Sequence, residues 1–323
     1  MAAITVRQAI SDALREEMER DENVFILGEE VGVWGGTYAV TRGFHDQFGD
    51  KRIKDTPIAE AAIIGAAIGA ALTGLRPIAE MMTINFAFSA FDHIVNEAPK
   101  LHYMFGGQFR VPMVIRAVGG GGRQLGATHS QTPDVIFAHF PGLKVVAPAT
   151  PADSKGLLKT AIRSDDPVLF IEHSTLYQWR GEVPDGEHLV EIGVSKVQRP
   201  GKHVTLVTYS KMLQLSMEAA DQLAKEGIEV EIVDLRSLRP LDMGPVLESF
   251  KKTNRCVIVE EGWRSFGVGA EVAARLYEEA FDYIDAPIKR VAQKEVPLPY
   301  NRELEQMALP QVKDIIAAVK EVL

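Results

Sequence analysis

Residues Thr56–Gly74 read TPIAEAAIIGAAIGAALTG, and a strand-like run, RPIAEMMTI, begins shortly afterwards at Arg76. The first run holds one charge, Glu60, among residues that are otherwise almost all Ala, Gly or Ile. Asp55 and Thr56 are residue types that cap helices, and Pro57 suits a first helical turn. A helix followed at once by an apolar strand is the unit from which α/β domains with parallel sheets are built.

The helix predicted in this run differs from a membrane span. A spanning helix needs about 20 predominantly apolar residues with bulky lipid-facing side chains. This run is shorter, is poor in Leu and Phe, and is flanked by Asp55 and Arg76. Gly65 and Gly69 have the small-xxx-small spacing that lets a second backbone approach closely. The sequence therefore predicts a helix packed tightly against another helix, in the same chain or across a subunit interface, and no membrane partner.

The composition excludes several classes of partner. A formal net charge of -9 and a pI of about 5.5 offer no attraction for nucleic acid or an anionic membrane. The single cysteine, Cys256, lies in the apolar run RCVIVEE and can form neither an intrachain disulfide nor a cysteine zinc site. This fits a reducing compartment and predicts a cytoplasmic location. The N-terminal run MAAITVRQAISDALREEMERD has too many acids for a transit peptide and lacks the apolar core of a signal peptide.

Short Val- and Ile-rich runs alternate with helical patterns along the chain, which predicts an α/β fold of two doubly wound domains. The predicted domains are residues 1–180 and 203–323, joined by a connector over 181–202 with one edge strand. In the first domain, strands are predicted at NVFILGEEV, RPIAEMMTI, VPMVIRAV, LKVVAPAT and PVLFIEHS, and helices at the N-terminus, the small-residue run, FAFSAFDHIVNEAPKLHYM and PADSKGLLKTAIRS. In the second, strands are predicted at VTLVTYS, IEVEIVDLRSL, RCVIVEE and IKRVAQ, and helices at MLQLSMEAADQLAKEG, GAEVAARLYEEAF and LPQVKDIIAAVKEVL.

Ligands of an open parallel sheet bind beyond the carboxyl ends of its strands, so segments that follow strands are candidate sites. Glu60 either interacts with the helix dipole, worth about 0.3–1 kcal/mol, or serves chemistry as a carboxyl group beside an apolar interior. His129 lies in the polar loop GGGGRQLGATHSQTPD. It is either a surface histidine on a mobile loop or a proton-exchanging group, since an unperturbed histidine has a pKa of about 6.5.

Several other catalytic motifs are absent from the sequence. It contains no GxxxxGK[ST] phosphate loop, no GxSxG nucleophile elbow and no HxxxH or HExxH pair, so a metal site made by the protein alone is not expected. FGVGAEVA imitates a dinucleotide-binding GxGxxA, but no tight strand-to-helix turn precedes it and no acid closes a following strand.

Four stretches together resemble one protein family. They are GEEVGVWGGTYAVTRGFHDQFGDKRIKDTPIAE, GLRPIAEMMTINFAFSAFDHIVNEAPKLHYMFGG, ATHSQTPDVIFAHFPGLKVVAPATPADSKGLLKTAIRSDDPVLFIEH and PLPYNRELE. From Ile4 to its C-terminus, the chain resembles the β subunit of the thiamine-diphosphate-dependent 2-oxo acid dehydrogenase component. The final segment, PLPYNRELEQMALPQVKDIIAAVK, is most similar to the branch that acts on pyruvate. The resemblance implies an N-terminal pyrimidine-binding domain, a C-terminal transketolase-like domain and an α2β2 heterotetramer.

The resemblance also implies a reaction and a division of labour. The reaction is the oxidative decarboxylation of pyruvate, with acetyl transfer to the lipoyl group of a dihydrolipoyl acyltransferase core. The α subunit would hold the diphosphate of thiamine diphosphate through Mg²⁺, and this chain would hold the aminopyrimidine. The α-subunit metal motif of the family begins GDG, whereas the nearest string here is GDK at Gly49. The chain would therefore be an oxidoreductase subunit that is active only with an α subunit.

The same resemblance gives roles to five side chains. Glu60 would hydrogen-bond N1′ of the aminopyrimidine and favour the tautomer whose exocyclic nitrogen removes the C2 proton. Phe86 would pack against that ring, and Ile58 would line the same pocket. His129 would stabilise bound substrate or intermediate and assist acyl transfer. Glu29 would relay protons between two cofactor sites.

Some members of the family bind a structural K⁺ through backbone carbonyls near TAIRSDDP. The corresponding positions here are Ala161, Ile162 and Asp166, although Ser164 replaces an acidic residue of the family.

Two alternatives stay open. The substrate could be acetoin or a branched-chain 2-oxo acid, because a difference of one methylene in a pocket is worth only about 1–3 kcal/mol. The chain could also be a non-catalytic assembly subunit. The joint presence of Glu60, Phe86 and His129 argues against that reading.

Overall fold

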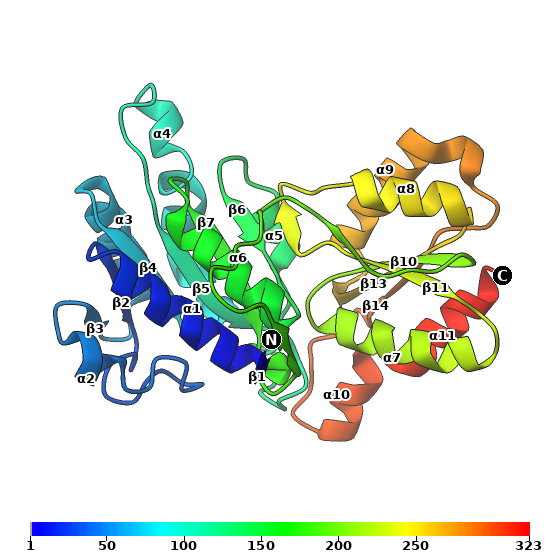
Figure 1. Ribbon diagram of the computed structural model, residues 1–323, viewed down its shortest axis with the longest axis horizontal. Helices are drawn as coiled ribbons and strands as arrows, with labels where there is room; N and C mark the ends of the chain where they lie inside the picture. Colours follow the sequence, from blue (N-terminus) through cyan, green and yellow to red (C-terminus); the bar gives the residue numbers. More distant parts are fainter. Residues whose placement is uncertain (1) are drawn as a thin grey trace. The chain divides into compact units, whose positions relative to one another are not determined.

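The computed structural model describes residues 2–323, and the chain divides into two compact units (Figure 1). The first unit contains the chain up to Gly119 together with Ile136–Ile192. The second contains Gly120–Val135 together with Gly193–Leu323. The loop that carries His129 therefore folds with the second unit, although both neighbouring segments belong to the first. Each unit has a largely parallel sheet with helices, so the predicted α/β class is confirmed.

The first unit is built on a parallel sheet with the strand order β6-β7-β5-β4-β2-β3. The strands are β2 (Val24–Gly28), β3 (Ile53–Asp55), β4 (Arg76–Met81), β5 (Val114–Gly119), β6 (Lys144–Val146) and β7 (Val168–His173). Every residue of β2, β5 and β7 is buried, as expected for parallel strands covered on both faces. Gly28 pairs in register with both Asp55 and Glu80, so the carboxyl ends of β3, β2 and β4 meet at one edge.

Two long helices pack side by side on this sheet (Figure 1), namely α1 (Val6–Arg20) and α6 (Pro151–Arg163). Ile10, Leu14 and Met18 recur at helical spacing along α1 and are fully buried. Burial of each such side chain contributes about 1.5–3 kcal/mol. A separate antiparallel pair joins β1 (Ala2–Thr5) to β8 (Arg180–Val183).

The small-residue helix α3 (Glu60–Leu72) begins later than the sequence predicted. Its N-cap is Ala59, which offers no side-chain cap, so the predicted capping by Asp55 and Thr56 is wrong. Asp55 instead ends β3, and its Oδ1 accepts a hydrogen bond from the backbone N–H of Gly32 at 2.6 Å. The carboxylate thus fixes the loop after β2 rather than the helix.

Only one face of α3 is buried within the chain. That face packs on β4 and on the two short helical segments that follow it. It consists of Ile63, Ile64, Ala67, Ile68 and Ala71. Ala62, Ala66 and Gly69 are exposed, and a Cβ added to Gly69 would meet none of the described atoms within 4 Å. The predicted tight packing is therefore present on one side of the helix, and the glycine side is open.

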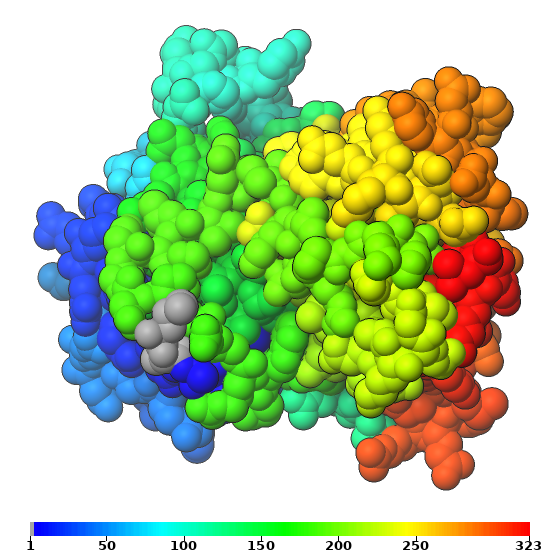
Figure 2. Space-filling view, turned by 45° about the vertical axis from the view of Figure 1, so that its right-hand side comes forward, coloured from blue at the N-terminus to red at the C-terminus, as the bar shows by residue number. Residues whose placement is uncertain are grey.

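The stretch predicted as a single helix, FAFSAFDHIVNEAPKLHYM, is broken into three pieces. These are the 3₁₀ helix η1 (Ile84–Ala90), the π-helical turn η2 (His93–Glu97) and α4 (Leu101–Met104). Pro99 lies between the last two and cannot donate the backbone hydrogen bond that a continuous helix requires. The segment that begins with α4, cyan in Figure 2, projects from the surface and leaves Tyr103 88% exposed.

The second unit has the sheet order β14-β13-β10-β11-β9, in which only β9 runs antiparallel. Helices α7 and α11 cover one face of this sheet, and α8 and α9 cover the other (Figure 1). The strands are β9 (Lys196–Arg199), β10 (Val204–Thr208), β11 (Val230–Asp234), β13 (Cys256–Trp263) and β14 (Lys289–Gln293), and the helices are α7 (Lys211–Lys225), α8 (Gly244–Thr253), α9 (Val268–Ala280), α10 (Arg302–Ala308) and α11 (Val312–Glu321). Cys256 is buried in β13 as predicted, and burial raises the pKa of its thiol.

Some short elements were not predicted from the sequence. The predicted connector contains β8 and β9 rather than one edge strand. The remaining elements are α2 (Phe44–Phe48), α5 (Asp134–Ala138), η3 (Ser174–Leu176), β12 (Ser237–Arg239) and η4 (Phe281–Tyr283). Among residues 2–323, no helix is long and apolar enough to cross a membrane.

Candidate functional site

Three predicted site residues follow neighbouring strands of the first sheet. Glu29 comes directly after β2, Glu60 opens α3 after β3, and Phe86 lies in η1 after β4. Because these strands are parallel, adjacent and in register, their carboxyl ends lie at the same edge. This edge is where open parallel sheets bind ligands.

Glu29 and Glu60 interact electrostatically at this edge. Glu29 is 6% exposed, and burial raises its pKa, with a further rise from the negative charge of Glu60. Glu60 is half-buried at the first position of α3. In the described chain its carboxylate makes no hydrogen bond or ion pair, although the helix dipole favours a negative charge at this position. The site therefore contains a carboxylate whose hydrogen-bonding capacity is unused within the chain.

The surroundings of Glu60 fit the edge and face of a flat heteroaromatic ring. A carboxyl group can pair with a ring nitrogen, and Ile58, just before it in the chain, is 79% exposed. Phe86 is half-buried, so part of its ring remains accessible. An aminopyrimidine needs both a polar partner at one ring nitrogen and apolar contact with its faces, and these residues can supply both.

His129 lies in the second unit, on an exposed part of its loop. The hydroxyl of Thr128 lies 2.8 Å from Nδ1 of His129, and the backbone N–H of His129 donates to the carbonyl of Gly126 at 3.3 Å. Gly120 and Gly122 have φ angles of +84° and +91°, which glycine adopts without steric cost. The glycine run therefore shapes a defined turn before the histidine.

An ion network around the buried side chain of Arg116 was missed from the sequence. Arg116 on β5 pairs through Nη1 with Glu80 at 2.5 Å and through Nε with Glu172 at 2.7 Å. The hydroxyl of Tyr177 donates to Glu172 at 2.6 Å. Burial alone would lower the pKa of Arg116, but the two carboxylates raise it above its ordinary value. The available signal was a charge inside each of the apolar strands RPIAEM, VIRAVG and VLFIEH.

A second group of buried acids lies in the second unit. Burial raises the pKa of Asp134 to about 7, helped by the charge of Glu261, while the Tyr209 hydroxyl hydrogen-bonds to it and opposes the rise. Burial likewise raises the pKa of Glu260 to about 7. Burial lowers the pKa of Lys211, a lowering that the charge of Glu261 opposes. The unit that carries His129 therefore contains two buried carboxyl groups whose pKa values lie near neutrality.

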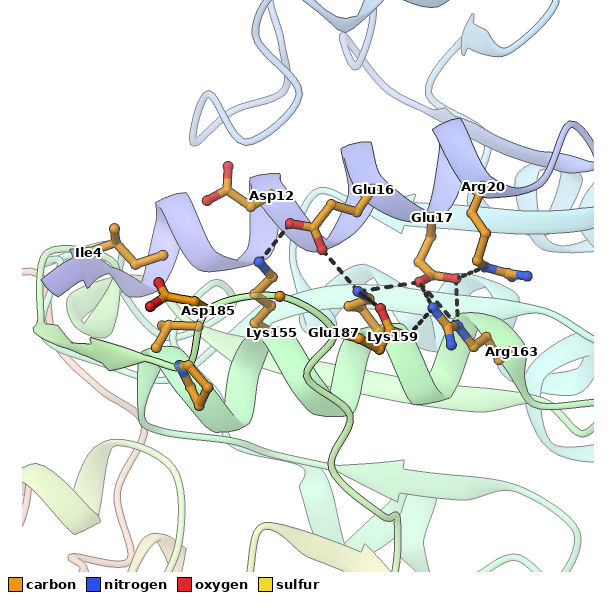
Figure 3. Close-up of a pocket in the computed structure, with 13 residues that line it drawn as sticks. Ile4, Asp12, Glu16, Glu17, Arg20, Lys155, Lys159, Arg163, Asp185 and Glu187 are labelled. Atoms are coloured by element: carbon orange, nitrogen blue, oxygen red, sulfur yellow. Dashed lines mark hydrogen bonds and ion pairs between the residues drawn. The ribbon is translucent and has the colours of Figure 1, made fainter. Parts of the chain in front are cut away.

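A charged cavity of about 450 Å³ lies between α1 and α6 (Figure 3). Lys159 Nζ bonds Glu16 at 2.9 Å and Glu187 at 2.8 Å, and Arg163 Nη2 bonds Glu17 at 2.6 Å. These pairs connect the two helices and the loop that contains Glu187. Because the opposite charges satisfy one another, this cavity serves the fold rather than chemistry.

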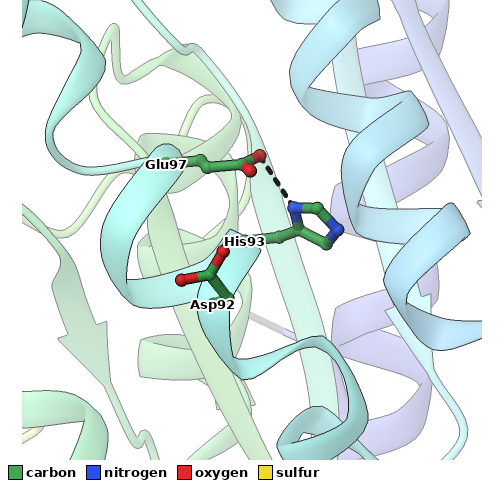
Figure 4. Close-up of side chains that lie close together, drawn as sticks. All are labelled: Asp92, His93 and Glu97. Carbon is green, nitrogen blue, oxygen red and sulfur yellow. Dashed lines mark ion pairs between the residues drawn. The ribbon is translucent and has the colours of Figure 1, made fainter.

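Asp92, His93 and Glu97 form a cluster whose ligand-type atoms lie within 4.8 Å of one another (Figure 4). Nδ1 of His93 lies 2.7 Å from Oε2 of Glu97. Asp92 already accepts a hydrogen bond from Asn96 at 2.6 Å. All three groups lie on η2 and the residue before it, and Asp92 and His93 each already contact a neighbouring side chain.

The positions expected to bind K⁺ are occupied by protein donors. Arg76 Nη1 donates to the carbonyl of Ile162 at 3.0 Å, and the carbonyl of Ala161 accepts from the backbone N–H of Ser164 at 3.1 Å. Asp166 pairs with Lys144 at 3.0 Å. A K⁺ ion would have to share these oxygens with two protein cations, and the K⁺ site stays a prediction.

Comparison with known proteins first defines the class. Residues 2–180 match the family of transketolase pyrimidine-binding domains, and residues 193–315 match the family of transketolase C-terminal domains. A solved structure described as a split-gene transketolase, inactive β4 tetramer, superimposes with a TM-score of 0.79 at 28% identity. The match covers 100% of this chain and 99% of that one. The fold is thus that of a transketolase-type pair of domains.

Full-length relatives narrow the class. The pyruvate dehydrogenase E1 component β subunit of Rickettsia felis is 51% identical over 319 residues, which cover 99% of this chain and 98% of the relative. The mitochondrial β subunit of Dictyostelium discoideum is 49% identical over 99% of this chain and 91% of its own length. The Rhizobium meliloti subunit is 49% identical over 100% and 70%. The chain belongs to the family of pyruvate dehydrogenase E1 component β subunits, which confirms the family predicted from the sequence.

Proposed function

We propose that this chain provides the pyrimidine-binding half of a thiamine-diphosphate-dependent pyruvate dehydrogenase component. The observation that carries the assignment is the unpaired carboxylate of Glu60 at the carboxyl edge of a parallel sheet, electrostatically coupled to buried Glu29. The full-length relatives support pyruvate as the substrate, since their names specify it.

Each of the four predicted site residues in the first unit has a defined task in this proposal. Glu60 hydrogen-bonds N1′ of the aminopyrimidine and holds a proton at that atom. Phe86 and Ile58 orient the ring and exclude water from its faces. Glu29, whose pKa is raised, accepts and returns protons beside Glu60. Bound thiamine diphosphate supplies the electron sink that decarboxylation of a 2-oxo acid requires.

His129 acts at the substrate end of the site. Its imidazole stabilises the bound substrate and supplies a proton during acetyl transfer to the lipoyl group. Thr128, whose hydroxyl lies beside Nδ1, fixes the orientation of the ring.

The active assembly is proposed to be an α2β2 heterotetramer. The α subunit holds the diphosphate through Mg²⁺, and a dihydrolipoyl acyltransferase core receives the acetyl group. The open glycine side of α3 supports such an assembly, because Gly69 leaves room for a close backbone contact. A reducing cytoplasm is the proposed location, consistent with one buried, unpaired thiol.

The test is reconstitution of the chain with its α subunit, thiamine diphosphate and Mg²⁺, followed by dye-coupled oxidation of pyruvate, 2-oxoisovalerate and acetoin. The proposal expects activity only when both chains are present, with the highest kcat/KM for pyruvate. A preference for either of the other substrates would reassign the substrate. A well-assembled, cofactor-loaded complex inactive on all three would indicate an assembly subunit.

A further inference from the structure

The segment PLPYNRELE (Pro297–Glu305) has no part in the function proposed so far. It enters α10, whose N-cap Asn301 accepts a hydrogen bond from the N–H of Leu304 at 3.0 Å. Glu305 is fully buried on this helix although it is charged. A fully buried glutamate needs hydrogen-bond donors or a cation to offset its loss of hydration. The groups that bind Glu305 therefore indicate what it does.

The partners of Glu305 belong to the loop that carries His129, here called the His129 loop (Gly120–Thr132). The backbone N–H of Gly122 donates to Oε1 at 2.9 Å, and the backbone N–H of Gln124 donates to the same oxygen at 3.2 Å. The side-chain Nε2 of Gln124 donates to Oε2 at 3.0 Å. Gln124 has a φ of +53°, so the turn is held in a left-handed conformation that most residues avoid.

The same loop also makes apolar contacts with the PLPYNRELE segment. A Cβ added to Gly121 would lie 2.6 Å from Leu298, and one added to Gly126 would lie 2.5 Å from the ring of Tyr300. Both glycines therefore let the backbone of the His129 loop lie directly on the PLPYNRELE segment. A second carboxylate, Glu261, accepts from the N–H of Gly121 at 2.7 Å.

The position of His129 depends on the contacts of Glu305 with Gly122 and Gln124, here called the Glu305 clamp. Its own backbone N–H bonds back to Gly126, which rests on Tyr300. The two ends of the His129 loop are joined by the bond from Gly120 N–H to the carbonyl of Gln131 at 3.1 Å. Between these points, the turn at Gly122 and Gln124 is held by the carboxylate of Glu305.

We infer that Glu305 is a positioning residue for His129: its buried carboxylate fixes the turn of the His129 loop and so sets where the imidazole meets the substrate. The inference rests on the proposed role of His129 in acyl transfer. Glu305 touches neither substrate nor cofactor in this scheme and acts only through the loop.

Two variants test the clamp itself, with the full chain and without an activity assay. Glu305→Gln keeps the size of the side chain but turns one acceptor into a donor that faces Gln124. Glu303→Gln, on the exposed side of the same helix, is the matched control. Trypsin cleavage after exposed Arg123 is followed by mass spectrometry. The cleavage rate is expected to rise about tenfold in Glu305→Gln, which corresponds to the loss of roughly one charge-assisted hydrogen bond. The rate of the control is expected to equal that of the wild type.

Gln124→Asn is a second variant that tests the same contact in case Glu305→Gln does not fold. Asparagine tolerates a positive φ, but its shorter side chain cannot reach Oε2 of Glu305, so a smaller acceleration, about threefold, is expected. Cleavage rates equal to wild type in both folded variants would overturn the clamp.

A double-mutant cycle in the reconstituted complex tests the action through His129. Acetyl transfer to a lipoyl domain is measured for Glu305→Gln, His129→Ala and the double variant. Glu305→Gln is expected to slow transfer about tenfold, and the double variant to be no slower than His129→Ala alone. Multiplicative losses, or unchanged transfer despite a loosened loop, would overturn the inference. Normal transfer by His129→Ala would instead refute the proposed role of the histidine, while the trypsin result would still report on the clamp.

Discussion

Because the pKa of Asp134 is raised in the folded chain, we expect the free energy of unfolding to depend on pH in a way that can be calculated. Asp134 is buried at the start of α5, and its pKa is about 7 in the folded chain against an ordinary 3.8. The folded state therefore binds more protons than the unfolded state between these two values, so stability falls as pH rises through this interval and levels off above pH 7. Asp134→Asn removes this titration and keeps an oxygen that can accept from Tyr209.

The magnitude follows from the two pKa values. At pH 6 folded Asp134 is mostly protonated, whereas at pH 8.5 it is mostly ionised; the unfolded carboxyl is ionised at both. The difference in bound protons between the folded and unfolded states, integrated from pH 6 to pH 8.5, equals about one pH unit. The free energy of unfolding of Asp134→Asn relative to the parent chain therefore rises by about 1.4 kcal/mol over this range.

Urea unfolding of the two chains at pH 6, 7 and 8.5 measures this difference directly. Asp282→Asn, at an exposed position in η4, is the control and should show a difference that does not vary with pH. Glu260 titrates in both chains, so only the part of its titration that is coupled to the charge of Asp134 differs between them. An advantage of Asp134→Asn that is constant with pH, or one that shrinks as pH rises, would refute the reasoning.

Three further predictions concern the first unit. Arg116→Met leaves the carboxylates of buried Glu172 and half-buried Glu80 without a cation and should lower the free energy of unfolding by about 3–5 kcal/mol, which denaturant unfolding checks; a loss below about 1 kcal/mol would mean that the network is dispensable. Gly69→Leu should stabilise the isolated chain by up to about 1 kcal/mol, because glycine disfavours helix, yet weaken assembly with the α subunit in sedimentation velocity; unaltered assembly would remove α3 from the interface. If K⁺ fills the predicted site, exchange of K⁺ for Na⁺ should lower the unfolding temperature; an unchanged temperature would mean that Arg76 and Lys144 supply the positive charge there instead.

The sequence predicted those parts of the fold that depend on local patterns. β2, β5 and β7 were predicted because strands buried on both faces are apolar throughout. β3 was missed because it is short and lies at the edge of the sheet, with only Ile53 buried. The segment around Pro99 was mistaken for one helix because its apolar spacing is helical even though its hydrogen bonding is interrupted.

The candidate site was only partly predictable for a related reason. Glu29 lies at the carboxyl end of a predicted strand, where an α/β sheet binds ligands. Glu60 was singled out as the one charge in an apolar run, and the roles of both residues came from the resemblance to a family. Arg116 and Glu172 stand far apart in the sequence, and nothing local shows that they pair. The bonds between Glu305 and the His129 loop likewise join segments 183 residues apart, and only the folded structure brings them together.

The most direct test of the account is Glu60→Gln in the reconstituted complex, with thiamine diphosphate binding and pyruvate decarboxylation measured on the same samples. Glu182→Gln, exposed on β8, is the matched control. The account predicts that assembly persists in both variants and that decarboxylation falls at least about 100-fold in Glu60→Gln alone, the loss expected when an essential proton-holding group is removed. Decarboxylation near the wild-type rate in a fully assembled Glu60→Gln complex would contradict it and reduce Glu60 to a stabiliser of the helix dipole.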